Sequence, residues 1–161
     1  MMSGEPLAYL LTWVTYGTWL PGDERGWIEY QQGWQLPSPI KELEATAVMT
    51  EHTCILTPEQ RVAVEVQIAQ TCQIRGWHLH AVNCRTNHLH AVVTAPSTAP
   101  KKVRVDLKAW STRRLKQQFD PSRVNWWAER GSVRFLNSQS ELENATVYVQ
   151  DAQDRKWRDF L

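Results

Sequence analysis

Short apolar runs along the chain predict four β-strands. Residues 8–15 form an uninterrupted run of strand-forming apolar side chains, which is typical of a central strand buried on both faces. Two further strands, 77–82 and 88–93, are separated by the short polar segment 83–87 and are therefore expected to form a hairpin. A fourth short strand or hairpin is expected within 127–135.

Apolar side chains at helical spacing, together with capping residues, predict three helices. The first begins where Thr57 and Gln60 form a capping box and ends at Gly76. The second is a basic helix over about 103–119, and the third starts at Ser138. The side chains expected to face inward are Val62, Val66 and Ala69 on the first helix, Val103, Leu107, Trp110 and Leu115 on the second, and Leu142, Ala145, Val149 and Ala152 on the third.

The order of these elements is strand, helix, strand, strand, helix, strand, and then an extra helix. This βαββαβ pattern predicts an α+β fold: a ferredoxin-like sandwich with one antiparallel sheet and an additional C-terminal helix over about 138–153. A chain of 161 residues is close to the usual size of one domain, so we expect residues 1–161 to form a single domain. The long segment 16–56 is expected to be an irregular loop insertion.

The charges of the chain are segregated along the sequence. Residues 1–74 carry three basic and nine acidic side chains, a net charge of −6, whereas residues 75–161 carry fifteen basic and eight acidic ones, a net charge of +7. The segment 101–134 alone has ten basic side chains against three acidic ones. This segregation favours binding of a polyanion by the C-terminal half, although the total charge is only +1.

The cysteines and the N-terminus indicate a cytoplasmic protein. Cys54, Cys72 and Cys84 are odd in number and form no CxxC pair, which fits reduced thiols. No run of eighteen apolar residues occurs, and the N-terminus has no basic leader. We therefore expect no membrane span and no signal peptide.

The pattern His88-Leu89-His90 on a predicted strand is the sharpest candidate for chemistry. Successive strand side chains point to opposite faces, so the two imidazoles share one face. Two neutral histidine nitrogens form part of a divalent-metal site and leave positions for a third ligand and for substrate oxygens. The plainer alternative is a pair of solvent-facing histidines.

A second pair, His78-Leu79-His80, occurs on the preceding predicted strand. Both pairs could lie on one face of the hairpin and cooperate in one site. We favour His88 and His90 as the metal-binding pair, because their strand continues as the apolar run of a central strand, which holds ligands rigidly. Periodicity alone does not decide between the pairs.

Tyr148 lies at the edge of the apolar face of the last predicted helix. Such a tyrosine commonly packs its ring and leaves its hydroxyl in water. The functional alternative is nucleophilic catalysis, in which the phenolate attacks phosphorus and forms a covalent phosphotyrosine. A phenol has a pKa near ~10, so this reaction requires a phosphate that a metal ion has made more electrophilic.

The basic helix is a candidate surface for phosphate contacts. Asp106 is its only acidic residue, whereas surface helices normally mix both signs of charge. A solvated charged face is the alternative explanation. The candidate DNA-contacting residues are Arg104, Lys108, Ser111, Thr112, Arg113, Arg114 and Lys116.

Taken together, three motifs in this order resemble the single-tyrosine HUH transposases, which include small insertion-sequence transposases and REP-associated tyrosine transposases. The motifs are TNHLHAVV around His88 and His90, LKAWSTRRL in the basic helix, and TVYVQDAQ around Tyr148. The opening LTWVTYGTWLPGDERG is similar to the start of some members. The resemblance covers nearly the whole chain.

The resemblance implies a metal-dependent nuclease and strand transferase that acts on single-stranded DNA next to a hairpin. It implies that Tyr148 is the nucleophile that forms a 5′-phosphotyrosine, and that His88 and His90 bind Mg²⁺ or Mn²⁺. Similar enzymes often act as homodimers in which the tyrosine helix serves the partner's histidine pair, so a homodimer is expected and a monomer remains open.

The third metal ligand departs from the family pattern. The family commonly places a glutamine or similar group one helical turn after the tyrosine, but Ala152 occupies that position here. The resemblance suggests Gln153, although in an α-helix it lies about 140° around from Tyr148. Asp151 shares the face of the tyrosine better and is the rival.

Two other classes of function compete with this hypothesis. The first is a non-catalytic nucleic-acid-binding module whose tryptophans and histidines stack on bases. The second is an unrelated protein that binds Zn²⁺ through its clustered histidines. The segregated charge argues against the second.

Overall fold

The computed structural model describes residues 4–18, 20, 25–29 and 33–152, and these contain one four-stranded antiparallel sheet in the order β4-β5-β1-β6. The strands are β1 (Ala8–Val14), β4 (His78–Cys84), β5 (His88–Thr94) and β6 (Ser132–Leu136). Each neighbouring pair is antiparallel, and β5 and β1 occupy the centre. This topology is that of a ferredoxin-like α+β sandwich, as the βαββαβ order predicted.

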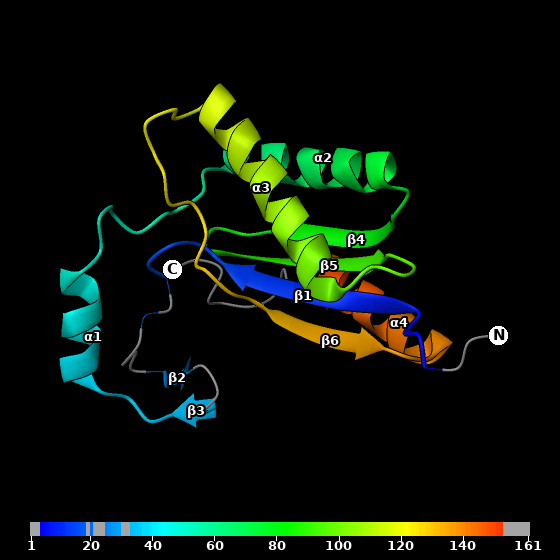
Figure 1. Ribbon diagram of the computed structural model, residues 1–161, viewed down its shortest axis with the longest axis horizontal. Helices are drawn as coiled ribbons and strands as arrows, with labels where there is room; N and C mark the ends of the chain where they lie inside the picture. The colour runs from blue at the N-terminus through cyan, green and yellow to red at the C-terminus, as the bar shows by residue number, and fades with distance from the viewer. Residues whose placement is uncertain (1–3, 19, 21–24, 30–32, 153–161) are drawn as a thin grey trace.

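Helices cover both faces of the sheet (Figure 1). On one face lie α2 (Pro58–Arg75) and α3 (Pro100–Gln118). On the other face lie α4 (Gln139–Val147) and the π-helical turn η1 (Tyr148–Ala152) that continues it. The predicted C-terminal helix is therefore present, but its last described turn is not α-helical.

Local capping fixes the ends of the helices. Thr57 accepts a hydrogen bond from the Gln60 backbone at 3.2 Å, and the Gln60 side chain accepts one from the Thr57 backbone at 2.9 Å, so the predicted capping box forms. Gly76 ends α2 with a φ of 75°, a conformation that favours glycine. Ser138 caps α4 by accepting from the Glu141 backbone at 3.2 Å.

The alternating side chains of β5 divide the interior into two apolar clusters. Leu89, Ala91 and Val93 pack toward α2 and α3, where Trp13 and Leu107 complete the larger cluster. Val92 points to the opposite face and packs with the inward residues of α4 and η1, among them Leu142, Ala145 and Val149. His88 and His90 share the parity of Val92, so they belong to the α4 face.

Two predictions about inward helix faces are wrong. Val62 is 60% exposed and Val66 is also exposed, because α2 buries Val64, Ile68 and Cys72 instead. Trp110 was expected to face inward on α3 but is 38% exposed. In α2 the buried stripe is set by the neighbouring helix and sheet and differs from the most apolar spacing in the sequence, whereas Val103, Leu107 and Leu115 of α3 are buried as predicted.

The segment 16–56 is more ordered than the irregular loop expected for it. It contains the short strands β2 (Trp27–Glu29) and β3 (Gly33–Gln35), which pair with each other, and the helix α1 (Pro39–Ala47). Ser38 caps α1 by accepting from the Lys41 backbone. These elements lie beyond the end of the main sheet (Figure 1).

Two further expectations can be compared with the structure. Within 127–135 one strand, β6, forms and extends to Leu136, and Trp127 makes a single bridge to Thr15. Cys54, Cys72 and Cys84 are free and buried. Burial raises the pKa of Cys72 to about 11, which keeps this thiol protonated. No helix among the described residues is long and apolar enough to cross a membrane.

Candidate active site on the α4 face of the sheet

The centre of the sheet carries the predicted histidine pair. His88 and His90 lie on β5, both are buried, and their ring centroids are 5.2 Å apart. The strand is hydrogen-bonded on both sides, to β1 and to β4, so its backbone is held along its full length. Two imidazoles on a doubly paired strand are held rigidly, as a pair of metal ligands would have to be.

Nδ1 of each of these two histidine rings has a defined hydrogen-bond partner. Thr12 on β1 lies opposite His90, and its Oγ1 is 2.7 Å from Nδ1 of that ring. Nδ1 of His88 is 2.9 Å from Oδ1 of Asn87. An amide oxygen only accepts, so Nδ1 of His88 donates and the lone pair of the neutral ring lies on Nε2. Such partners orient metal-binding histidines and fix their tautomers.

Tyr148 lies beside this pair in the same chain. Its ring centroid is 5.7 Å from that of His90, and the rings meet edge to face. Tyr148 is the C-cap of α4 and the first residue of η1, and it packs at the edge of the apolar cluster. The structure therefore brings together the three residues that the sequence singled out.

Asn83 ties the tyrosine turn to the sheet. It lies on β4 opposite His90, is buried, and donates from Nδ2 to the carbonyl oxygen of Val149 at 3.0 Å. The sequence analysis had placed Asn83 in the hairpin connection, whereas β4 continues to Cys84. This hydrogen bond holds the residue after Tyr148 against the strand next to the histidines.

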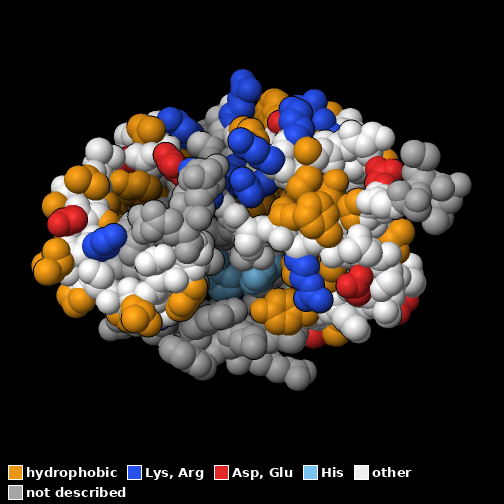
Figure 2. Space-filling view, turned by 60° about the horizontal axis from the view of Figure 1, so that its bottom comes forward, with side chains coloured by type: hydrophobic (Ala, Val, Ile, Leu, Met, Phe, Trp, Pro, Cys, Tyr) orange, Lys and Arg blue, Asp and Glu red, His pale blue; other side chains and the backbone are white. Residues whose placement is uncertain are grey.

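A cavity of about 220 Å³ opens on the other side of the histidine pair. It is lined by Thr12, Val14, Thr18, Arg25, Asn87, His88 and His90. Figure 2 shows histidine side chains at the bottom of a hollow on this face, with lysine and arginine side chains above it. The β1 side of the pair is thus hollow, whereas Tyr148 and Asn83 lie on the β4 side.

The third metal ligand is not identified. Within the described part of the chain, no group of three or more His, Cys, Asp or Glu side chains is placed to hold a metal ion. The rival candidate Asp151 is exposed on η1 and does not join the pair. The first candidate, Gln153, lies outside the described residues. The histidine pair thus supplies two ligands of a candidate metal site.

The second histidine pair occupies a different environment. His78 and His80 lie on β4, the edge strand, and their ring centroids are 4.4 Å apart. The register of β4 against β5 shifts between Leu79 and Ala81, so His80 lies in a bulge. Nε2 of His80 is 2.7 Å from Oγ1 of Thr94. The two pairs do not merge into one site.

Two of the predicted DNA-contacting residues are committed to the interior. Ser111 lies on the inner side of α3 and is fully buried. Lys108 directs its Nζ to the carbonyl oxygens of residues 128, 129 and 130 at 2.7, 3.2 and 2.9 Å. Burial, together with the nearby charge of Arg104, lowers the pKa of Lys108 to about 8. Among the predicted DNA contacts, these two side chains are therefore the least available, and their contact with DNA stays a prediction.

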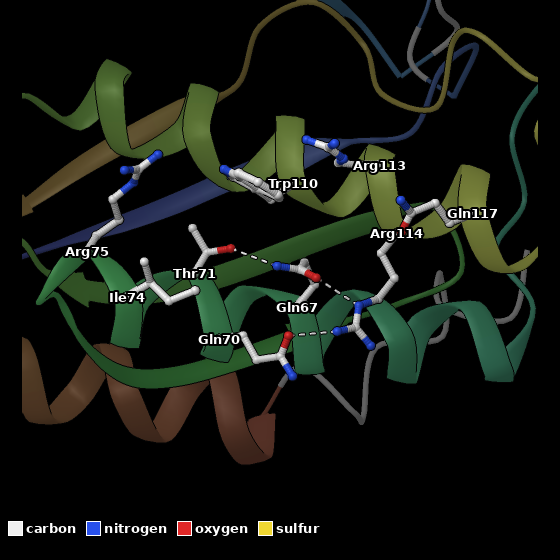
Figure 3. A pocket seen from close by; sticks show the side chains of 9 residues that line it. All are labelled: Gln67, Gln70, Thr71, Ile74, Arg75, Trp110, Arg113, Arg114 and Gln117. Atoms are coloured by element: carbon white, nitrogen blue, oxygen red, sulfur yellow. Dashed lines mark hydrogen bonds between the residues drawn. The ribbon is translucent and has the colours of Figure 1, made fainter.

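The remaining basic residues of α3 lie at or near the surface. Arg113 is exposed, and Arg104, Thr112, Arg114 and Lys116 are half-buried. Arg114 is held by hydrogen bonds to Gln67 at 2.8 Å and Gln70 at 2.7 Å. The guanidinium carbon of Arg113 lies 5.1 Å from the ring centroid of Trp110. Arg113, Arg114 and Trp110 line a groove of about 440 Å³ between α2 and α3, which Figure 3 shows from close by.

Sequence reasoning missed four residues of the site: Thr12, Asn83, Asn87 and Arg25. Thr12 and Asn83 are polar residues within or beside apolar strands, and both lie opposite His90. A polar residue opposite a candidate ligand indicates a functional contact once the strand register is known. The register depends on the pairing of distant strands, so the sequence alone does not show it. Arg25 lies in the insertion, and nothing in the sequence connects it to β5.

The sequence matches the family of IS200-like transposases over residues 43–152. That match covers α1 to η1 and includes His88, His90, the basic helix and Tyr148. The chain belongs to this family and is a transposase by that membership. No curated protein matches the chain.

Two solved structures share the fold at low sequence identity. A putative transposase from Deinococcus radiodurans R1 is similar with a TM-score of 0.54 and 17% identity, over 94% of this chain and 97% of that one. A REP-associated tyrosine transposase bound to a REP hairpin is similar with a TM-score of 0.54 and 11% identity, over 90% of this chain and 65% of that one. Both similarities support the ferredoxin-like fold.

Proposed function

We propose that this transposase cuts and rejoins single-stranded DNA through a covalent intermediate on Tyr148, with His88 and His90 binding a divalent cation. The observation that carries the proposal is the contact between the Tyr148 ring and His90, at 5.7 Å between centroids. A nucleophile and a metal-binding pair are the two components that phosphotyrosine chemistry requires.

In the proposed reaction, the phenol oxygen of Tyr148 attacks phosphorus. A bond forms between that oxygen and the phosphate on the 5′ side, the bond from phosphorus to the 3′ oxygen breaks, and the phenol proton passes to solvent while the 3′ oxygen leaves as a hydroxyl. The reverse reaction with another 3′-hydroxyl rejoins a strand. One phosphodiester replaces another at each step, so no nucleotide cofactor is consumed.

The donor set fits a divalent cation. Nδ1 of His88 donates to Asn87, and when Nδ1 of His90 likewise donates to the Thr12 hydroxyl, Nε2 is the ligand atom of both rings. Mg²⁺ and Mn²⁺ are the candidate ions, and water and phosphate oxygens would fill the positions that the two imidazoles leave open. When bound, such an ion polarises a phosphate oxygen and neutralises charge that develops on it. Asn83 and Thr12 keep the tyrosine turn and the His90 ring in place.

The proposed DNA surface is the exposed side of α3 and the groove beside it. The residues that remain from the sequence prediction are Arg104, Thr112, Arg113, Arg114 and Lys116. Trp110 adds a partly exposed ring on which a base can stack. The family resemblance, and the hairpin in one of the similar structures, support a DNA hairpin as the ligand.

Replacing Arg113 with alanine should weaken DNA binding and lower its salt dependence.

Tyr148 approaches the histidines of its own chain, which supports cleavage in cis. One chain thus supplies the nucleophile and two metal ligands. The homodimer expected from the resemblance is then compatible with catalysis but not required for one cut. A monomer should form the covalent intermediate.

The decisive experiment is capture of the covalent intermediate. The wild-type protein is incubated with Mn²⁺ and a pool of single-stranded oligonucleotides, each with a hairpin beside randomised sequence, and adducts are separated on a denaturing gel and sequenced. Tyr148→Phe should form no adduct while binding the same pool, because it lacks only the phenol oxygen. Tyr16→Phe is the matched control, since Tyr16 lies outside the site and should leave adduct formation unchanged.

The alternative outcomes separate the competing functions. If Tyr148→Phe still attaches covalently, the nucleophile is another residue. If the wild type binds the pool equally well in chelator and never forms an adduct, the protein is a non-catalytic nucleic-acid-binding module.

A further inference from the structure

A fixed positive charge lines the cavity next to the histidine pair, and it comes from the insertion. Among the described residues that line this cavity, Arg25 is the only one with a permanent charge, and none of them is a carboxylate. Arg25 is also one of only three basic residues in the whole of 1–74, a segment that carries nine acidic ones. A basic side chain at this cavity is therefore unusual for a segment that is otherwise mainly acidic.

Hydrogen bonds connect Arg25 to the end of the central strand. Its guanidinium donates from Nη2 to the carbonyl oxygen of Thr18 at 2.8 Å. Thr18 bonds through its hydroxyl to Thr15 at 2.6 Å, and the Thr15 backbone donates to the carbonyl oxygen of Asn87 at 2.9 Å. Arg25 is thus linked in three steps to the residue that precedes and orients His88.

The backbone beside Arg25 is shaped by close packing. Gly26 is buried with a φ of +83°, and a Cβ there would lie 2.2 Å from a ring atom of Trp34 and 3.0 Å from the carbonyl oxygen of Gln35. Only glycine fits this position. The hairpin of β2 and β3 therefore packs against the backbone next to Arg25. This packing fixes the position from which the Arg25 side chain extends.

Tyr148 and the cavity lie on opposite sides of the histidine pair. Tyr148 and Asn83 lie on the β4 side of β5, whereas Thr12 and Arg25 lie on the β1 side. A phosphate bound over the histidines would have the nucleophile on one flank and a guanidinium on the other. Arginine binds phosphate oxygens through charged, often bidentate hydrogen bonds, which strengthen as negative charge develops in the transition state.

We propose that Arg25 binds the non-bridging oxygens of the scissile phosphate and stabilises the transition state of cleavage. This inference rests on the proposed function, because it needs a phosphate at the histidine pair. It assigns to the insertion a direct part in the chemistry.

The test compares Arg25→Ala, Arg25→Lys and the wild type. With an oligonucleotide recovered from the adduct pool, Arg25→Ala should slow single-turnover adduct formation by about 10²-fold, as the loss of one positioned donor does. Arg25→Lys should recover only part of the rate, because an ammonium keeps the charge but lacks the planar fork. Lys41→Ala is the control: it removes an exposed charge from α1 in the same insertion and should change nothing.

A substrate change identifies the phosphate that Arg25 contacts. When the scissile phosphate is replaced by an uncharged methylphosphonate, the difference between Arg25→Ala and wild type should largely disappear. If Arg25→Ala cuts at the wild-type rate, or if the difference persists undiminished on the methylphosphonate, the proposal is overturned.

Binding to unstructured DNA separates this inference from the proposed function. The affinity of a thymidine homopolymer falls with salt, and each phosphate contact contributes about 0.7 to the slope of log affinity against log salt on a single strand. Arg25→Ala should reduce that slope by about this amount. If the wild type forms no adduct but this reduction is observed, the cleavage chemistry fails while the phosphate contact stands. An unchanged slope contradicts the contact directly.

Discussion

The two His-Leu-His motifs show how position in a sheet changes the chemistry available to the same three residues. His88 and His90 lie on β5, which is paired on both sides, and both rings are buried beside Tyr148. His78 and His80 lie on the edge strand, where His78 is exposed and His80 lies in a bulge. A metal-binding pair requires fixed ligand directions, and only the central strand supplies them.

The hydrogen bonds of the two pairs differ in the nitrogen that they use. Thr12 contacts Nδ1 of His90, which leaves Nε2 as the ligand atom. Thr94 contacts Nε2 of His80 and at the same time donates its hydroxyl proton to the carbonyl oxygen of Leu7 at 2.7 Å. Nε2 of His80 must therefore donate to Thr94, and it has no lone pair for a metal. The Thr12 contact therefore leaves Nε2 of His90 open to a metal, whereas the Thr94 contact occupies Nε2 of His80.

The largest expected effect comes from removing each pair in turn. His88→Ala with His90→Ala should reduce adduct formation by about 10³-fold or more, because both metal ligands are lost, a larger change than loss of one positioned donor. His78→Ala with His80→Ala should leave the rate within about threefold of wild type, the range expected away from the site. Single-turnover adduct assays measure both.

Folding and metal binding have to be measured on the same variants. Circular dichroism and thermal unfolding show whether the loss of the buried pair unfolds the protein, and Mn²⁺ titration shows whether a folded variant has lost the ion. A folded His78 and His80 variant that neither binds Mn²⁺ nor cuts DNA would reverse the assignment of the two pairs.

A smaller effect is expected from the two threonines. Thr12→Val removes the hydrogen bond that orients His90 and should raise the Mn²⁺ concentration needed for half-maximal adduct formation by about 10- to 100-fold, as loss of such partners typically does. Thr94→Val removes the equivalent bond of His80 and should leave the metal requirement unchanged. Equal effects of the two substitutions would show that orientation of His90 is not the cause.

The general architecture and the central residues of the site were predictable from the sequence. The strand pattern of 88–93 placed His88 and His90 on one face, and the capping residues located α2 and α4. Tyr148 was predicted at the edge of an apolar face and is found there. These features depend on local periodicity and on neighbours within a few residues, which a sequence displays directly.

The surroundings of the site were not predictable, because they depend on contacts between distant segments. Thr12 reaches His90 through the pairing of β1 with β5, which are 78 residues apart at this point. Lys108 looked like a DNA contact because it is a lysine on a basic helix, but the backbone of residues 128–130 accepts its protons. The sequence also does not show that the insertion folds toward β5 and carries Arg25 there.

A further, weaker effect concerns the third metal ligand. The resemblance favours Gln153 over Asp151, and because Tyr148–Ala152 form a π-helical turn, the spacing of an ideal α-helix does not decide between the two. Gln153→Ala should raise the Mn²⁺ requirement by about tenfold, and Asp151→Ala should not change it. Adduct assays over a range of Mn²⁺ concentrations measure this. The opposite order would assign the ligand to Asp151.

The smallest expected effect is a pH dependence confined to the edge pair. Burial, with a contribution from the neighbouring His78, lowers the pKa of His80 below its usual 6.5. The unfolded chain then binds more protons than the folded one between the lowered pKa and 6.5, so stability falls as the pH falls through this window. Above pH 6.5 the neutral ring contributes its full stabilisation.

The substitution His80→Gln should remove this pH dependence while leaving cleavage intact. Between about pH 7.5 and about pH 5.5, the Tm of the wild type should fall by more than that of His80→Gln. His78→Gln should give an intermediate result, because it removes the neighbouring charge but not the burial. Since His80 is bonded to Thr94 and is not one of the three residues assigned to the site, adduct formation by His80→Gln should match the wild type at the higher pH. A loss of cleavage without a change in the Tm profile would mean that the edge pair has a catalytic role that the geometry of β4 does not indicate.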